Sequence, residues 1–323
     1  MTKAGWAFFL AAAVSLAIGP KAIELLARLK LRQTISEDAP ERHRDKQGTP
    51  MMGGLIILIG TAVGTAAFWT QSSRLSAVVL LTLAFAGLGF LDDMLIATRG
   101  KSLGLKARQK LLIQFVLAIA FMIWVHANRT AYPTGVPLWG GRMIDLGWAY
   151  YPIAVLMIVG MSNAFNLADG LDGLVSGLTV IVALTLGAIL MASESSGMST
   201  ISWALAGGCI GFLWYNCNPA KVFMGDTGSL ALGAATAGIA IAARIEFFYL
   251  VICLIFLVEA FSVMLQVASF KSTGKRIFKM TPIHHHFELS GWPEQKIVVR
   301  FWIVQGLISL AVLGWLGILK VWR

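Results

Sequence analysis

The chain alternates between long unbroken runs of apolar residues and short segments that hold nearly all of its charged side chains. A helix needs about 20 apolar residues to cross a hydrocarbon core of about 30 Å. The runs show none of the period-2 alternation of a transmembrane β-barrel, so the pattern predicts an all-α polytopic membrane protein. Ten transmembrane helices are predicted, at about 5–27, 51–70, 75–96, 111–126, 148–166, 173–192, 201–217, 229–244, 249–270 and 300–321.

Composition narrows the class further. Of the 323 residues, 57% are hydrophobic and only 13% are charged. Soluble domains carry about a quarter charged residues, so neither an ordinary water-soluble domain nor a disordered chain fits. The predicted spans fill most of the chain, which indicates a single integral membrane domain over residues 1–323. The first run is longer than the apolar core of a signal peptide, so we expect a retained first helix.

Lysine and arginine are distributed unevenly between the two sets of loops. The loops at about 28–50, 97–110, 217–228 and 271–300 hold 18 of the 26 basic residues, whereas the other loops and the termini hold seven. The positive-inside rule therefore predicts that the first set is cytoplasmic and that both termini lie outside. Because topology accounts for the net charge of +10, no nucleic-acid partner is needed to explain it.

Acidic residues gather at the ends of the predicted helices on the cytoplasmic side. Asp92 and Asp93 end the third span, Asp169 and Asp172 follow the fifth, and Asp226 follows the seventh. Carboxylates at this depth are costly unless they are paired or bind a cation. Adjacent carboxylates also repel each other, and a divalent cation relieves that repulsion. Solvation of helix ends explains one such acid but not five, so the acids predict a cation site.

Two polar segments surround these acids. The segment 163–173 carries amides and carboxylates at every third residue, including Asn166, and this spacing stacks them on one helix face. Asn and Asp side chains suit the donor and acceptor edges of a base or sugar. The segment 216–229 adds Asn216, a proline, two glycines around Asp226, and Phe223 as a stacking surface.

Three consecutive histidines, His284, His285 and His286, lie in the last cytoplasmic loop. Successive side chains point in different directions, so a shared zinc ion is disfavoured. Solvated loop histidines are the plain alternative. Binding or protonating a phosphate is preferred, because the loop also carries four basic residues: Lys271, Lys275, Arg276 and Lys279.

The basic loop from Arg99 to Lys110 suits a phosphate-bearing partner as well, although membrane topology alone explains it about equally well. Glu259 lies within the ninth predicted span, and the sequence does not decide between a structural and a functional acid. Carboxylates, basic side chains and glycine turns on one face are typical of Mg²⁺-dependent phosphoryl transfer. Their position where helix meets water indicates that one reactant is a lipid.

Five motifs carry a family resemblance, and they follow one another from about Lys46 to Arg300. They are GTPMMGG (48–54), GFLDD (89–93), NAFNLADGLDG (163–173), NCNPAKVFMGDTGS (216–229) and PIHHHFE (282–288). On these motifs the chain resembles the polyprenyl-phosphate N-acetylhexosamine-1-phosphate transferase superfamily. PIHHHFE is most similar to the members that use a muramoyl-pentapeptide donor, since relatives with other sugars arrange these histidines differently.

The resemblance implies the reaction and its surroundings. Phospho-MurNAc-pentapeptide would pass from UDP-MurNAc-pentapeptide to undecaprenyl phosphate, giving lipid I and UMP, with Mg²⁺ as cofactor. The enzyme would cross the bacterial cytoplasmic (inner) membrane many times, with its active site facing the cytoplasm. Every predicted helix is apolar all round, which is compatible with a homodimer but hides any partner face.

The resemblance also implies roles for individual residues. Asp226 would be a Mg²⁺ ligand, with Asp92 and Asp93 against the metal and the lipid phosphate. Asp92 is preferred as the base or positioning group. Other residues would bind the donor or its phosphates: Lys110 (preferred over Arg108), Asn166, Asp169, Asp172, Asn216, Phe223, His284 and His286, with His285 counted among the catalytic residues.

Two alternatives remain at this point. A sister transferase would move GlcNAc-1-phosphate by the same mechanism, but it would need a different histidine arrangement. An ion-coupled transporter would place its charged residues near the bilayer midplane, often in broken helices. Here only Glu259 is deep in a predicted span, so the transporter is disfavoured.

Overall fold

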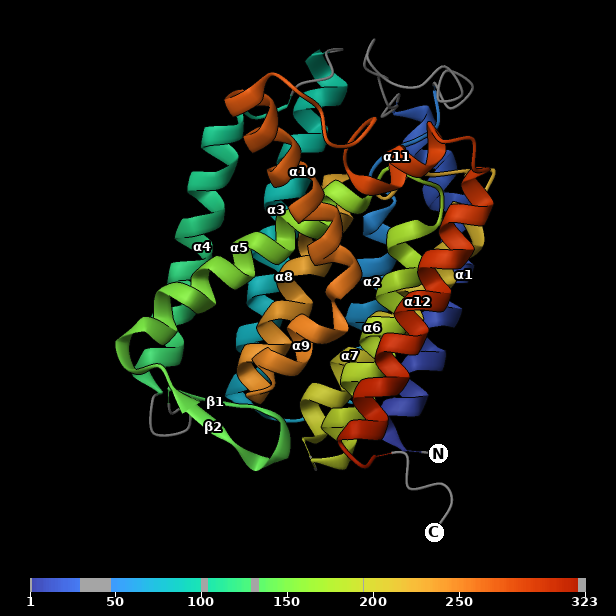
Figure 1. The fold of residues 1–323 in the computed structure, drawn as a ribbon. Coiled ribbons are helices and arrows are strands. Elements are labelled where there is room, and N and C mark those ends of the chain that lie inside the picture. The colour runs from blue at the N-terminus through green and yellow to red at the C-terminus, as the bar shows by residue number, and fades with distance from the viewer. Residues whose placement is uncertain (1, 30–47, 100–103, 129–133, 194, 319–323) are drawn as a thin grey trace.

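The computed structural model describes residues 2–29, 48–99, 104–128, 134–193 and 195–318, which form one bundle of helices (Figure 1). Within these residues, nine helices are long and apolar enough to cross a membrane, and α2 (Gly54–Ala67) is a shorter apolar helix. An all-α polytopic membrane protein is therefore confirmed. The nine helices are α1 (Lys3–Arg28), α3 (Ser73–Arg99), α4 (Ala107–Ala127), α5 (Tyr150–Ala168), α6 (Leu174–Ala192), α7 (Ser196–Asn216), α8 (Gly225–Ala243), α10 (Leu254–Thr273) and α12 (Glu294–Trp315).

Two segments differ from the predicted pattern. The span expected at about 249–270 is divided at Cys253 into α9 (Glu246–Ile252) and α10, although no proline or glycine marks the break. The segment before α5 forms an antiparallel hairpin of β1 (Gly135–Pro137) and β2 (Met143–Asp145), in which Val136 pairs with Ile144. A short helix, α11 (Ile283–Glu288), carries the three histidines.

Helix α8 lies at the centre of the bundle, and every residue from Thr227 to Ala242 is buried. Its small side chains let neighbouring helices approach closely, which is how helices associate in membranes. Gly89 of α3 is an example, because a methyl group at that position would collide with the backbone at Asp226 and Thr227. Such contacts fix the ends of α3 and α8 against each other.

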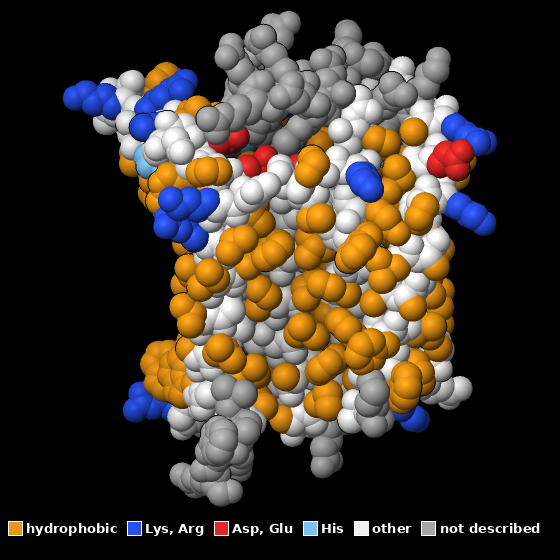
Figure 2. Space-filling view, turned by 90° about the vertical axis from the view of Figure 1, so that its right-hand side faces the viewer, with side chains coloured by type: hydrophobic (Ala, Val, Ile, Leu, Met, Phe, Trp, Pro, Cys, Tyr) orange, Lys and Arg blue, Asp and Glu red, His pale blue; other side chains and the backbone are white. Residues whose placement is uncertain are grey.

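The face of the bundle seen in Figure 2 is apolar around its middle, and its charged side chains lie mainly at the two ends. Large hydrophobic side chains of α4, α10 and α12, such as Leu112, Met264 and Leu307, are more than half exposed. Such a band is unfavourable in water and suits a lipid environment. The start of α1 lies at one end of the bundle, with the hairpin, and α11 lies at the other (Figure 1). We call these the hairpin end and the α11 end.

Candidate functional site

The predicted acids meet at the α11 end because several helices terminate there. Asp92 and Asp93 lie in the last two turns of α3, and Asp226 lies in the first turn of α8. Lys110 is in the first turn of α4, and Asn166 is in the last turn of α5. Residues far apart in the chain thus form one cluster, which we call the carboxylate cluster.

Lys110 links two of these carboxylates. Its Nζ atom donates to Oδ2 of Asp226 and lies 3.4 Å from Oδ2 of Asp92. The other oxygen of Asp92 accepts a hydrogen bond of 2.6 Å from the backbone N–H of Leu105. The lysine is therefore a counter-ion inside the cluster, whereas Arg108 is exposed.

Asp93 has a different set of partners from its neighbour Asp92. Its carboxylate accepts the backbone N–H groups of Asp226 and Thr227, at 3.0 and 2.9 Å, and the Thr227 hydroxyl at 2.6 Å. These N–H groups are the unpaired donors that every helix leaves at its start. Gly225 makes the approach possible, because its φ is +73° and a methyl group there would press on the Asp93 carboxylate. Asp93 thus holds the start of α8 in place.

Asn166 orients the other side of Asp226. Its Nδ2 atom donates to Oδ1 of Asp226 at 2.7 Å and lies 2.9 Å from the Ser229 hydroxyl. Together with Lys110, this amide gives both oxygens of Asp226 a protein partner. The carboxylate is therefore fixed in position before any ligand binds, as a preorganised site requires.

Asp169 contributes the least satisfied carboxylate. Its side chain is half-buried, and it accepts no hydrogen bond from any residue that the structure describes. Burial raises the pKa of Asp169 to about 8, with the nearby carboxylates of Asp226 and Asp93 as further causes. The carboxyl group is thus available to a ligand, and burial favours its protonated form.

This pKa predicts how stability depends on pH. In the unfolded chain Asp169 ionises near 3.8, whereas in the folded protein it holds its proton up to about pH 8. The folded state binds more protons between these values, so the free energy of unfolding falls as pH rises. Asn cannot ionise, so Asp169→Asn should lose less thermal stability than the wild type between about pH 5 and about pH 8. Thermal unfolding of both proteins in detergent with EDTA measures this, and an equal or larger loss in the variant would contradict it.

Asp172 and Asn216 are bound within the protein. Oδ2 of Asp172 accepts from Nδ2 of Asn218 at 3.1 Å and from the Ala220 N–H at 3.0 Å. Its own backbone N–H donates to Glu294 at the start of α12. Oδ1 of Asn216 accepts from the Gly173 N–H at 3.1 Å and from Oγ of Ser176 at 2.7 Å.

These contacts join the turn after α5, the loop after α7 and the start of α12. Both side chains, predicted to contact the nucleotide, therefore join the turn after α5 to the end of α7 and the loop after it in the described structure. Asn218 and Glu294 complete this network, and no local pattern in the sequence predicts them, because their partners are far away along the chain.

The histidines occupy three environments on α11. His284 is fully buried, with Nδ1 3.1 Å from Oε2 of Glu259 on α10. His285 is half-buried and pairs with Glu288 at 3.0 Å. His286 accepts the backbone N–H of Lys279 at 3.2 Å. The three rings therefore have three different partners: Glu259, Glu288 and the backbone of Lys279.

Phe223 lies beside the first motif, and its ring is half-buried. Its backbone N–H donates to the Pro50 carbonyl, and its carbonyl accepts from the Gly53 N–H, at 2.9 and 2.8 Å. The segments 48–54 and 216–229 are therefore joined at the start of α8.

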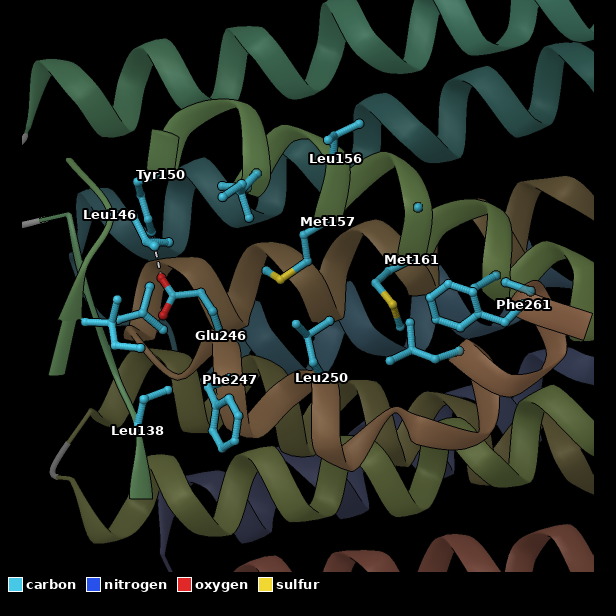
Figure 3. A pocket seen from close by; sticks show the side chains of 18 of the residues that line it. Leu138, Leu146, Tyr150, Leu156, Met157, Met161, Glu246, Phe247, Leu250 and Phe261 are labelled. Carbon is cyan, nitrogen blue, oxygen red and sulfur yellow. Dashed lines mark hydrogen bonds between the residues drawn. The ribbon is translucent and has the colours of Figure 1, made fainter. Parts of the chain in front are cut away.

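A deep apolar pocket of about 490 Å³ runs along α5 (Figure 3). It is walled by α9, α10 and the hairpin, and its lining extends from Tyr150 at one end of α5 to Ala164 near the other. Tyr150 donates a 2.6 Å hydrogen bond to Glu246 at the hairpin end (Figure 3). Because Ala164 is only two residues from Asn166, the inner end of the pocket approaches the carboxylate cluster.

The bundle thus carries a cluster of carboxylates, amides and a lysine at one end, and residues 75–244 match glycosyl transferase family 4, a class of transferases. Phospho-N-acetylmuramoyl-pentapeptide-transferases of three bacteria are similar over nearly the whole chain. The relative from Heliobacterium modesticaldum is 48% identical, covering 97% of each chain. The relative from Pelotomaculum thermopropionicum is 45% identical, covering 95% of this chain and 96% of its own. The relative from Bacillus mycoides is 43% identical, covering 97% and 96%. The chain therefore belongs to the phospho-N-acetylmuramoyl-pentapeptide-transferase family, which confirms the resemblance seen in its motifs.

Proposed function

We propose that this protein transfers phospho-MurNAc-pentapeptide from UDP-MurNAc-pentapeptide to undecaprenyl phosphate, giving lipid I and UMP. The observation that carries the proposal is the carboxylate cluster, in which Lys110 lies between Asp92 and Asp226 at the membrane end of four helices. The names of the full-length relatives describe the same transfer of a phosphorylated muramoyl-pentapeptide. An ion-coupled transporter does not fit this family.

The chemistry needs positioning more than a strong base. An oxygen of the lipid phosphate attacks the phosphorus that carries the sugar, a new P–O bond forms, and the bond to UMP breaks. A lipid phosphate is already largely ionised at neutral pH, since its second pKa is about 6. Asp92 and Lys110 would therefore act by placing and balancing charge, which is the main source of catalysis in phosphoryl transfer. His285 and His286 would assist at the phosphates.

The donor set fits Mg²⁺. Hard carboxylate oxygens suit this ion, which usually takes one or two carboxylates and completes its shell with water and substrate phosphates. Among the described residues, no three His, Cys, Asp or Glu side chains form a complete metal cage. Asp226 is proposed as the ligand, with Asp92 nearby. The bound ion would supply positive charge for the diphosphate, while Asn166 and Lys110 keep the Asp226 carboxylate oriented.

The proposed topology has ten spans with both termini outside, which requires α2 to count as the tenth. The excess of Lys and Arg in one set of loops supports it, as does the position of the carboxylate cluster at the end of the bundle opposite the start of α1. The protein would then span the inner membrane of a bacterium, with its active site on the cytoplasmic side.

UMP release tests the proposed function. Purified protein in detergent receives UDP-MurNAc-pentapeptide, undecaprenyl phosphate and Mg²⁺, and we expect UMP to appear only when all three are present. EDTA should abolish the release, and fresh Mg²⁺ should restore it. Release with UDP-GlcNAc but not with the muramoyl donor would instead assign the protein to the sister reaction.

The apolar pocket is proposed to hold part of the undecaprenyl chain. Gly160 of α5 lines this pocket, and a Cβ atom added there would meet no protein atom within 4 Å. Gly160→Phe should therefore fill the pocket without disturbing the fold. Losing burial of about two methylene groups weakens binding about tenfold, so KM for undecaprenyl phosphate should rise by that amount.

Gly306→Phe is the matched control, because Gly306 on α12 also has open space and lies outside the pocket. UMP release is measured over a range of lipid concentrations for both variants. A polyprenyl phosphate with a chain too short to reach Gly160 should be used equally well by both. An unchanged KM in Gly160→Phe would refute the assignment of the pocket.

A further inference from the structure

Glu259 and His284 form a buried pair that the proposed mechanism does not use. Oε2 of Glu259 lies 3.1 Å from Nδ1 of His284, and neither side chain is exposed at all. Within the part of the chain that the structure describes, none of the four polar atoms of these two side chains has a hydrogen-bond partner, so the short approach of Oε2 to Nδ1 is their one charged contact. A buried carboxylate or imidazolium is costly unless it has a partner. Each of the two groups therefore depends on the other.

The pair belongs to a narrow buried stripe on a helix that otherwise faces outward. The buried residues of α10 are Phe256, Glu259, Ser262 and Gln266. Phe256 stacks on Phe165 of α5 at 3.7 Å between ring centres. Gln266 binds the backbone of the segment before α11, accepting from the Phe278 N–H at 3.0 Å. The stripe thus anchors α10 to α5 on one side and holds the segment that leads to α11 on the other.

On the side away from Glu259, His284 contacts residues that border the proposed site. The rings of His284 and His285 lie 4.1 Å apart between centres. Gly170 packs against both rings, because a methyl group there would collide with His284 and would lie 3.3 Å from Nε2 of His285. Gly170 directly follows Asp169, whose carboxyl group is available to a ligand. An unbroken set of contacts therefore runs from Glu259 through His284 and His285 to the Asp169–Gly170 turn.

We propose that Glu259 is a positioning residue for the transfer. Its pair with His284 fixes the imidazole of His285 beside the Asp169–Gly170 turn, where the phosphates of the donor would lie. The inference rests on the proposed function, because His285 has a role only if a phosphate is transferred there. Glu259 should therefore affect turnover and leave acceptor binding unchanged.

Four variants test this in the whole protein: Glu259→Leu, Glu259→Gln, His284→Leu, and Glu259→Leu combined with His284→Leu. A catalytic group displaced by about 1 Å can cost about 100-fold in rate, so Glu259→Leu should lower kcat by up to that factor. Glu259→Gln keeps the volume of the side chain and a polar oxygen beside His284, so it should retain more activity than Glu259→Leu. KM for undecaprenyl phosphate should stay within about twofold of the wild type, since an altered acceptor site would change it by more.

The double variant separates positioning from independent effects. If Glu259 acts through His284, the double variant is no slower than the slower of the two single variants, Glu259→Leu and His284→Leu. If the losses in kcat of the two single variants multiply in the double variant, the proposal is overturned. A raised KM for the lipid would overturn it as well. An unchanged kcat in Glu259→Gln and Glu259→Leu would overturn it as well.

Ser262→Ala is the matched control, because Ser262 belongs to the same buried stripe and its hydroxyl donates to the backbone carbonyl of Glu259 rather than to its carboxylate. It should keep the wild-type kcat. Thermal unfolding of every variant gives the folded fraction, so that kcat is expressed per folded enzyme. If Glu259→Leu does not fold, Glu259→Gln decides the question. An inactive wild type would instead refute the proposed function, which keeps the two failures distinct.

Discussion

Asp226→Asn should abolish UMP release while the protein remains folded. The change preserves the size of the side chain but removes its charge, so Lys110 keeps only the carboxylate of Asp92 as an anionic partner. The proposed Mg²⁺ ligand is lost in the same step. Removing one preorganised electrostatic contact costs about 100- to 1,000-fold in kcat, and we expect a loss at or above the upper figure.

The control for this variant is Asp145→Asn. Asp145 is an exposed acid in β2 at the hairpin end, and its partners are Thr134 and Gly147. It should keep wild-type activity in the same assay, at the same folded fraction measured by thermal unfolding. Near-normal turnover in Asp226→Asn would remove Asp226 from the mechanism and leave the family membership intact.

Gly89→Ala should impair both stability and turnover. The added methyl group would collide with the backbone of Asp226 and Thr227, so α3 must move away from the start of α8. Overpacking of this kind lowers the free energy of unfolding by about 1–3 kcal/mol. The movement also separates Asp93 from the N–H groups that it caps, and a displacement of about 1 Å can cost about 100-fold in kcat.

Gly87→Ala is the matched control on the same helix. Gly87 lies two residues earlier, is exposed, and has no heavy atom within 4 Å of an added methyl group. Its melting temperature and its UMP release should equal those of the wild type. If the two alanine variants behave alike, the close approach of α3 to α8 does not determine the geometry of the carboxylate cluster.

The helices could be predicted because a long apolar segment in a membrane must satisfy its backbone hydrogen bonds internally, as a helix does. The span predicted at about 173–192 corresponds to α6 (Leu174–Ala192), and that at about 201–217 to α7 (Ser196–Asn216). The start of α8 was placed about four residues too late, because Gly225 and Asp226 read as part of a turn. The break between α9 and α10 has no signal in the sequence, since packing against the hairpin and α12 is a tertiary effect.

The residues that meet in the carboxylate cluster could be predicted from the sequence, but the separate contacts of each residue could not. Asp92 and Asp93 are adjacent in the chain, and the motif gives both a place against the metal. In a helix, successive side chains point about 100° apart. Asp92 therefore faces Lys110, while Asp93 faces the start of α8. The pairing of Glu259 with His284 depends on two segments meeting in space, which no local pattern reveals.

The central position of α8 has a consequence for how the protein is made. Helices α7 and α8 are among the least apolar of the nine long helices in the described residues, and they are also among the most buried. A segment rich in Gly, Ala, Ser and Thr gains little by facing lipid alone. We therefore expect α7 and α8 to leave the translocon together and to be retained by earlier helices. On this view, the carboxylate cluster is assembled only after α8 has found its place among helices already inserted.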